Sequence, residues 1–323
     1  MIKRLLILII AASLLSSCTW RYNFWQHFSH PKSNKPLVST PKMVKITQKT
    51  SPFTKVNVTG KLDVCLHPQS TFDQIVIHGD SRDVENIQRS VIHNELFISF
   101  GKGYPKGCRP KIDIYMRNII SFTYHGFGDV IAKNFVGNCM DLLIDNQRTT
   151  LLDGAFSVRK ATFMNTGQTK LRGLKSCAMV MDLRGNTDVK LVGYANVASI
   201  NMSENSKLSL YWIKSKLIKV ALKDRAKAQL AGVAETLDAK LCDKSRLNAR
   251  YLMSKNSFIK TYNDATAEIS VTKNQHTLAQ DRSNIYYYFL PETKTDFMAA
   301  DGSVLDMREW ERPFLKSTDR YNQ

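Results

Sequence analysis

The chain has 323 residues, and its 46 lysines and arginines outnumber its 28 aspartates and glutamates, which gives a formal net charge of +18. A charge of this size carries information about the partners of a protein rather than about its fold. The sequence contains no H-E-x-x-H or paired metal-ligand spacing, no G-x-S-x-G motif, no P-loop and no dinucleotide-binding fingerprint. Composition and motifs therefore give no reason to expect a metal, a cofactor or one of the common catalytic machineries.

The first segment, residues 1–18, has the pattern of a secretory signal peptide. Two basic residues precede an apolar run from Leu5 to Leu15, which is too short to span a bilayer as a stable helix. The run ends in Leu-Ser-Ser-Cys, which resembles a bacterial lipobox whose cleavage leaves Cys18 as the lipid-bearing N-terminus. Thr19 stands where an inner-membrane retention signal usually has Asp. We expect an exported, outer-membrane lipoprotein on either face of that membrane; the alternative is an ordinary signal peptide with a chance cysteine.

Residues 19–55 form a basic segment that contains Pro, Ser and Thr. The segment carries seven Lys or Arg and no Asp or Glu, so it cannot bury much surface and is expected to be an extended tether. Five aromatic residues between Trp20 and Phe28 directly follow the lipid site, where amphipathic rings favour the membrane interface. The tether is therefore expected either to lie against anionic lipid head groups or to act as a soluble spacer.

Residues 56–121 have strand-like composition without a regular period. Short β-rich stretches, such as Val56-Asn57-Val58 and Ile112-Asp113-Ile114, are separated by Gly and Pro. Atypical terminal units commonly cap the open end of a repeat fold, because an exposed sheet edge invites aggregation. We expect these residues to form an N-terminal cap that is continuous with the repeats that follow.

Residues 122–271 repeat themselves every 19 or 20 residues. Two apolar columns and one polar column keep the same intervals over seven units. The first apolar column is Leu151, Leu171, Leu191, Leu210, Leu230, Ala249 and Ile269. The second is Leu143, Phe163, Leu183, Met202, Leu222, Leu241 and Thr261. The polar column between them, made of residues that favour turns, is Asp145, Asn165, Gly185, Glu204, Asp224, Asp243 and Asn263.

This repeat predicts an all-β protein, a β-solenoid or β-helix. Apolar residues two apart on each side of the turn have the period of a strand, so each unit contains at least two short strands. One unit is too small to bury its own apolar face, and stacking about eight units supplies the missing burial. A leucine-rich repeat has a similar period, but its L-x-x-L-x-L-x-x-N/C spacing and helical return segment are not present. In the last segment, residues 272–323, an aromatic strand from Ile285 to Leu290 and a mixed polar stretch are expected to cap the last rung before a loose tail.

The chain resembles the auto-transporter adhesin-head family, also called the GIN domain, from about Val56 to Val271. The resemblance rests on a G-x-L-x-V opening at Gly60, a strand entry at Asn94 to Ile98, the Gly126-Phe127-Gly128-Asp129-Val130 turn and the rungs. It implies a β-solenoid in the envelope or at the cell surface, and it carries over no catalytic residues. The chain departs from the family in its strong positive charge and in Arg225 and Lys244, which occupy turn positions that favour Gly.

The sequence has six cysteines, of which Cys18 is assigned to the lipid. Cys139 and Cys177 lie two rungs apart, which is beyond disulfide reach. Cys65 and Cys108 both fall in the cap and are the candidate pair in an oxidising compartment. The alternative is that the five remaining cysteines are small buried hydrophobic residues.

The positive charge indicates anionic partners. The candidate ligand-binding residues are Lys102, Lys106, Arg109 and Lys111 in the cap and Lys214, Lys216, Lys219 and Lys223 in the rungs, where Lys207, Arg225 and Lys227 add to the charge. We expect a non-catalytic binding or adhesion surface for anionic glycan, lipopolysaccharide or a protein partner, attached to the membrane by its N-terminal lipid. An exported lipoprotein rarely meets nucleic acid, which is not expected as a partner. The alternative is that these lysines serve only solubility.

A carboxylate ladder gives an alternative function. Glu204, Asp224 and Asp243 stack in the turn column, about 5 Å apart, which is the separation of the catalytic pair in a retaining glycosidase. They could therefore serve a polysaccharide-modifying enzyme. The structural alternative is that they cap their own turns, with Arg225 and Lys244 balancing their charge.

Overall fold

The computed structural model describes residues 42–101, 103–288 and 293–308. The predicted signal peptide with Cys18, residue Lys102 and the tail after residue 308 lie outside these ranges. Within them, no helix is both long enough and apolar enough to cross a membrane.

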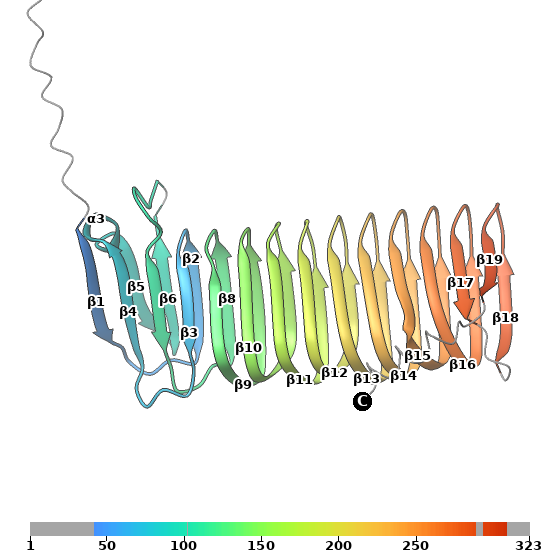
Figure 1. The fold of residues 1–323 in the computed structure, drawn as a ribbon, viewed down its shortest axis with the longest axis horizontal. Helices are drawn as coiled ribbons and strands as arrows, with labels where there is room; N and C mark the ends of the chain where they lie inside the picture. The colour runs from blue at the N-terminus through green and yellow to red at the C-terminus, as the bar shows by residue number, and fades with distance from the viewer. Residues whose placement is uncertain (1–41, 102, 289–292, 309–323) are drawn as a thin grey trace, which may run out of the picture. The chain divides into compact units, whose positions relative to one another are not determined.

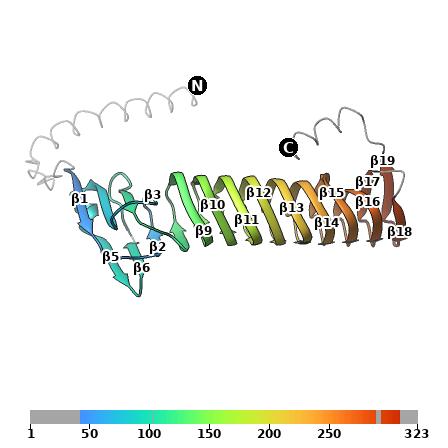
Figure 2. The same ribbon diagram turned by 90° about the horizontal axis from the view of Figure 1, so that it is seen from below.

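The described residues form, for most of their length, a parallel β-solenoid of about nine turns, which confirms the predicted fold class. Figure 1 shows the rungs stacked side by side, and Figure 2 shows the same stack from below. The regular part consists of long strands, each paired in parallel with the next strand in chain order. These strands are β9 (Val130–Asn146), β10 (Thr149–Met164), β11 (Gln168–Leu183), β12 (Asp188–Met202), β13 (Lys207–Leu222), β14 (Lys227–Leu241), β15 (Arg246–Thr261) and β16 (Thr266–Ala279).

Each long strand bends twice, so that a rung has three sides. In β13 the alternation of inward and outward residues is interrupted at Trp212 and again at Leu217. A tight turn, residues 223–226 in this rung, then leads to the next strand. The inward residues of all sides share one core, in which Leu210 and Ile218 are fully buried. Because a strand alternates its side chains between two faces, the two-residue spacing of the apolar columns places them in this core.

In the rungs of β9 to β14 the first bend contains a residue with a left-handed backbone. Gly193 and Gly232 hold this position in their rungs, with φ of 149° and 137°. A Cβ atom on Gly232 would lie 2.2 Å from the carbonyl oxygen of Ile213, so no side chain fits there. In β13 the left-handed residue of this bend is Trp212, with a φ of 63° and a partly exposed side chain; it directly precedes Ile213, which lies opposite Gly232. A left-handed backbone costs a residue other than Gly about 1–2 kcal/mol. The bend of β13, with Trp212, is therefore more strained than the bends of the adjacent rungs, which use Gly.

The first members of the predicted columns are wrong by one residue. Leu152, not Leu151, pairs with Leu171, and Ile144, not Leu143, pairs with Phe163. Both predicted residues are only half-buried. The adjacent residues in each place are apolar, so the pattern alone could not decide which of the two faces inward. The polar column shifts with them, and Asp145 lies opposite Met164 instead of Asn165.

The N-terminal strands do not stack in chain order. The segment with β2 (Lys55–Gly60) and β3 (Asp63–His67) lies between two later segments. On one side, β2 pairs with β6 (Glu95–Phe100) and β3 pairs with β7 (Lys111–Tyr115). On the other side, β2 pairs with β8 (Ser121–Gly126) and β3 pairs with β9. The chain therefore returns past its own first rung before the regular stack begins.

Antiparallel strands close the N-terminal end. β5 (Ile87–Ile92) pairs with β6, and β4 (Gln74–Asp80), followed by the short helix α3 (Ser81–Val84), pairs with β7 and with β1 (Met43–Lys49). The expectation of a tether up to residue 55 is therefore wrong from Met43 onward. Val44 and Ile46 alternate with exposed polar residues and pack against the core, which makes this stretch an edge strand.

The solenoid continues beyond Val271, where the sequence predicted its regular part to end. β17 (Asn284–Tyr288), β18 (Lys294–Ala299) and β19 (Val304–Arg308) add further parallel pairs. Asp281 and Asp301 repeat the left-handed turn backbone, with φ of 59° and 57°. The interval from Asn263 to Asp281 is shorter than every earlier interval, which hid this part of the repeat.

Candidate functional site

The turns between rungs are held by a ladder of polar side chains. Glu204, Asp224, Asp243 and Asn263 have left-handed backbones, with φ of 60°, 59°, 63° and 61°. Asp and Asn adopt this conformation more readily than other residues with side chains, because their short side chains form local hydrogen bonds. Here those bonds also run between rungs, since the backbone N–H of Glu204 donates to Oδ2 of Asp224 at 2.9 Å.

The same bond recurs along the edge. The N–H of Asp224 donates to Oδ2 of Asp243 at 3.4 Å, and the N–H of Asn263 donates to Oδ2 of Asp281 at 3.1 Å. Nδ2 of Asn263 donates to Oδ1 of Asp243 at 3.0 Å. Both aspartates of the candidate catalytic trio are therefore engaged in holding turns, so the trio, all of which the structure describes, keeps no pair of unengaged carboxylates. The geometry favours the structural alternative over the enzymatic one.

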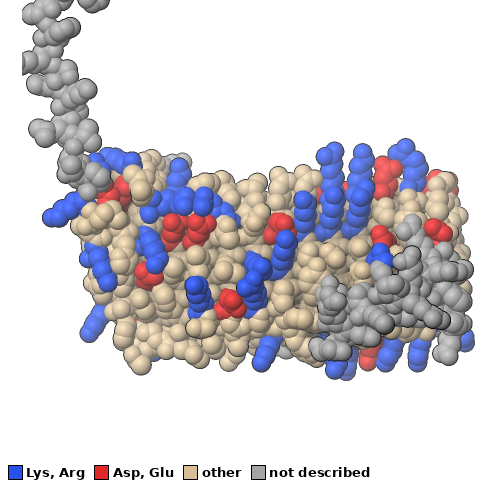
Figure 3. Space-filling view, in the orientation of Figure 1, with Lys and Arg blue, Asp and Glu red and all other residues tan. Residues whose placement is uncertain are grey.

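A group of cations lies beside these turns. We call it the basic ladder; it consists of Lys207, Arg225, Lys227, Lys244 and Arg246. Lys207 lies opposite Lys227, and Lys227 lies opposite Arg246, because each begins its strand in the parallel register. Arg225 and Lys244 follow the left-handed turn residues Asp224 and Asp243. The five cations line one open hollow of about 580 Å³ together with Asn186 and Asn205. Figure 3 shows this concentration of Lys and Arg at the turn edge, right of centre.

None of the five side chains of the basic ladder forms an ion pair in the described part of the chain, although Lys207 begins its strand opposite Asp188. In the following two rungs the position of Arg225 and Lys244 is held by Asp264 and Arg282, which do pair, at 3.1 Å. Like charges directly opposite each other in a sheet destabilise it. The ladder therefore concentrates positive charge at a cost to the free protein, and an anionic ligand would relieve that cost.

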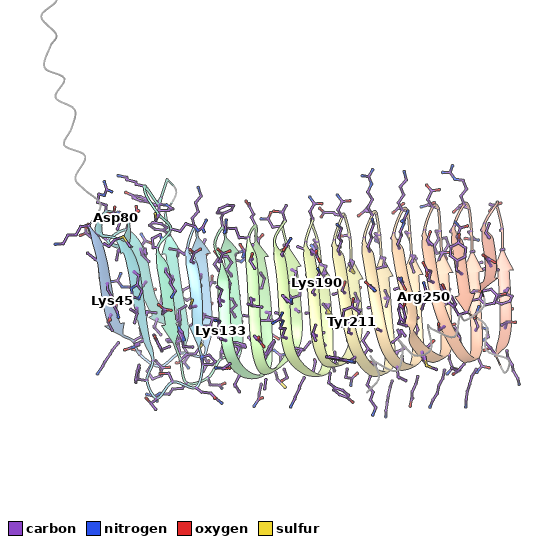
Figure 4. The ribbon with its side chains drawn as sticks, in the orientation of Figure 1. Lys45, Asp80, Lys133, Lys190, Tyr211 and Arg250 are labelled. Carbon is purple, nitrogen blue, oxygen red and sulfur yellow. The ribbon has the colours of Figure 1, made fainter. Side chains whose placement is uncertain are left out.

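A second hollow, of about 610 Å³, continues from the ladder down the first side of the rungs. Its floor carries the side chains of Ser209, Gln229 and Asn248. Each of them lies two residues after a stacked cation of the same strand (Lys207, Lys227 or Arg246) and therefore points to the same outward face. All three are half-exposed and can both donate and accept hydrogen bonds. Figure 4 labels two residues further along this side, Tyr211 of β13 and Arg250 of β15. The arrangement can hold a ligand that carries both negative charge and hydroxyl groups.

The four predicted rung cations do not form a stack. Lys214, Lys216 and Lys219 are exposed residues of the single strand β13 and follow one another around one rung. Lys223 is exposed in the turn after it. Neighbouring rungs place Val233 beside Lys214 and Asp238 beside Lys219. These lysines add positive charge to one rung, but they do not form a row of cations along the axis of the stack.

The predicted cap cations are mostly engaged in ion pairs. Arg109 pairs with Asp63 at 3.0 Å, and Lys111 pairs with Asp113 at 3.3 Å. Lys106 lies over the ring of Tyr104. The cap is therefore a weaker anion site than its sequence predicts. Sequence reasoning overlooked Lys244 and Arg246 as binding candidates, although their recurrence at fixed offsets after the turn residues could have identified them.

The predicted disulfide is wrong, because Cys65 and Cys108 are both free thiols. Cys65 lies opposite Asp113 within β7, whereas Cys108 lies in the loop before β7, so the register holds them apart. Burial raises the pKa of the Cys65 thiol above its ordinary value, which makes it less reactive. In the described ranges, no group of three or more His, Cys, Asp or Glu side chains is placed to hold a metal ion.

Fold and site together define a class of protein: a β-solenoid that presents charged and polar side chains on a repeating outer face. The chain matches the family model "Putative auto-transporter adhesin, head GIN domain" over residues 52–291. It belongs to that family, which confirms the resemblance seen in its sequence. The family groups adhesin-like domains of exported or cell-envelope proteins.

Solved structures with a similar course of the chain have low sequence identity. A "putative adhesin" from Parabacteroides merdae is 12% identical, with a TM-score of 0.42, over 83% of this chain and 96% of that chain. A "putative adhesin" from Parabacteroides distasonis is 14% identical, with a TM-score of 0.43, over 83% and 98%. A "putative lipid binding protein" from the same species is 11% identical, with a TM-score of 0.43, over 85% and 98%. A search of curated protein sequences finds no match.

Proposed function

We propose that this protein is an exported, lipid-anchored protein of the cell envelope whose solenoid is a non-catalytic binding or adhesion surface for anionic glycan, including the glycan of lipopolysaccharide. The basic ladder carries the proposal, because it gathers five cations without ion pairs among the described residues. Membership of an adhesin-like family supports a binding role. The apolar run and lipobox of the sequence support export to the outer membrane and anchoring through Cys18.

Binding is tested with the purified full-length chain and two charge-matched triple variants. The ladder variant carries Lys207→Ser, Lys227→Ser and Arg246→Ser. The control variant carries Lys214→Ser, Lys216→Ser and Lys219→Ser, and it removes the same charge from a single rung. We expect the wild type and the control to bind lipopolysaccharide at low salt and to release it at high salt, because screening weakens exposed charge interactions. Equal binding by the ladder variant would refute the assignment of the site.

Anchoring is tested separately, by growing cells that express the full-length chain with a radiolabelled fatty acid. The wild type should incorporate the label and fractionate with the outer membrane, and Cys18→Ser should do neither. Label in the Cys18→Ser variant would show that lipid is attached elsewhere.

A further inference from the structure

The stacked part of the basic ladder has a regular repeat along the solenoid. Lys207, Lys227 and Arg246 occupy one position in three successive rungs, so they follow one another at ~4.8 Å, the spacing of hydrogen-bonded strands. All three side chains are exposed. Their row crosses the strands and runs along the axis of the stack, unlike the cations of β13, which follow the strand.

A row of neutral polar side chains accompanies the cations. Ser209, Gln229 and Asn248 are opposite one another in the same three rungs, each two residues after its cation. Each rung therefore offers one positive charge and, beside it, one group that donates and accepts hydrogen bonds. A ligand that matches this surface has a repeating unit with one negative charge and at least one hydroxyl group.

We infer that the groove binds a linear acidic polysaccharide with a carboxylate on every sugar, lying along the solenoid axis with successive sugars on successive rungs. This inference rests on the proposed function and narrows its ligand. A sugar ring in an extended chain advances by a length similar to the strand spacing of ~4.8 Å. Successive rings are rotated about the chain axis, so the long, flexible Lys and Arg side chains reach around the chain to the carboxylates, one cation for each, while ring hydroxyls meet the neutral row. A phosphate group on a compact lipid head group would engage one or two rungs only.

The ends of the cation row set the length of ligand that the groove recognises. Beyond Lys207 the neighbouring rung holds Asp188 with Lys190 two residues later, and beyond Arg246 the next rung holds Thr266 with Glu268 two residues later. An acidic sugar would gain no net attraction from the opposite charges at the first end and would be repelled by Glu268 at the second. Linked binding units reinforce one another as long as each additional unit reaches a site. Affinity should therefore rise with chain length up to about three sugars, one for each cation, and then level off.

The inference is tested by calorimetric titration of the full-length chain with oligogalacturonates, namely the di-, tetra- and hexasaccharide. The methyl-esterified hexasaccharide is the uncharged control, and a single-stranded oligonucleotide is a second polyanion. We expect the tetrasaccharide to bind up to about fivefold more tightly than the disaccharide, because it reaches one more cation, and about as tightly as the hexasaccharide. One exposed ion pair contributes at most about 1 kcal/mol, or fivefold, so Lys227→Ser should weaken tetrasaccharide binding up to about fivefold and the ladder variant about a hundredfold. The control variant should bind like the wild type, and unchanged circular dichroism should confirm that both variants fold.

Each other outcome overturns a defined part of the reasoning. If the disaccharide binds as tightly as the tetrasaccharide, or if both triple variants lose affinity equally, the axial arrangement is wrong while the anionic-glycan function stands. If the oligonucleotide binds more tightly than the hexasaccharide, the ligand class is wrong. If neither oligogalacturonate nor lipopolysaccharide binds at low salt, the proposed function fails together with the inference.

Discussion

Replacing Asp224 tests whether the carboxylates of the turn edge stabilise the fold. Asp224 combines a left-handed backbone, with a φ of 59°, and a hydrogen bond from the N–H of Glu204 at 2.9 Å. Asp224→Asn keeps an acceptor and a residue that tolerates this backbone, so it should change the free energy of unfolding by less than about 0.5 kcal/mol. Asp224→Gly removes only the hydrogen bond, which is worth about 1 kcal/mol. Asp224→Ala also strains the backbone, by about 1–2 kcal/mol, and should lose about 2–3 kcal/mol in total.

Urea unfolding at constant m-value measures this order of stabilities. Native-state hydrogen exchange of the Glu204 amide gives a direct readout, since that proton should lose protection in the Gly and Ala variants and keep it in the Asn variant. An Ala variant as stable as the wild type, with a protected Glu204 amide, would refute the structural role of the carboxylate ladder and reopen the enzymatic alternative.

The remaining predictions concern the ladder, the cap and the core. The ladder variant should melt at a higher temperature than the wild type at low salt and at the same temperature at high salt, because like charges repel until they are screened; a lower melting temperature at low salt would show that the cations stabilise the free protein. Hydrogen bonds from Arg148 hold the pKa of Asp129 below its ordinary value. This pair therefore stabilises the fold fully above the ordinary carboxyl pKa and loses that contribution progressively as the pH falls from there through the lowered pKa of the folded protein. Asp129→Asn should therefore lower the urea midpoint at neutral pH more than at about pH 3, and an equal loss at both would contradict the pairing. Leu210→Asp places a charge in the core and should cost more than about 4 kcal/mol and unfold several rungs together; its outward neighbour Ser209→Asp should be tolerated, and similar circular dichroism for both variants would refute the inward assignment of Leu210.

The sequence predicted the repeat well because burial imposes a strict alternation on every strand. Leu191, Leu210 and Leu230 are fully buried at the positions that their spacing predicts. The prediction was wrong by one residue at Leu143 and Leu151, where an apolar neighbour satisfies the pattern equally well. It also ended too early, because one shortened interval interrupted the period before Asp281. Periodicity therefore identified the fold, whereas the register at the two ends of the repeat could be assigned only from the strand pairing in the structure.

The sequence could not show the stacking order of the N-terminal strands or the candidate site. No local pattern distinguishes a rung such as Asp63–His67, which pairs on both sides with later strands, from one that stacks in chain order. Total charge directed attention to lysines that are close in sequence, such as Lys214 and Lys216. The structure shows that residues of different rungs, such as Lys227 and Arg246, are the neighbours along the axis. In a solenoid, surface chemistry follows the rung interval rather than the sequence neighbourhood.

The bonds between the turns tie each turn to both of its neighbours. The backbone N–H of Asp224 donates forward, to a carboxylate oxygen of Asp243 in the following turn. The backbone N–H of Arg225 donates backward, to the carbonyl oxygen of Glu204 in the preceding turn at 2.9 Å. Removing a rung from either end therefore takes away the acceptor of a backbone N–H in the turn that stays behind. A solenoid pulled from one end would resist unravelling one rung at a time, because every rung that is released breaks a bond of its neighbour.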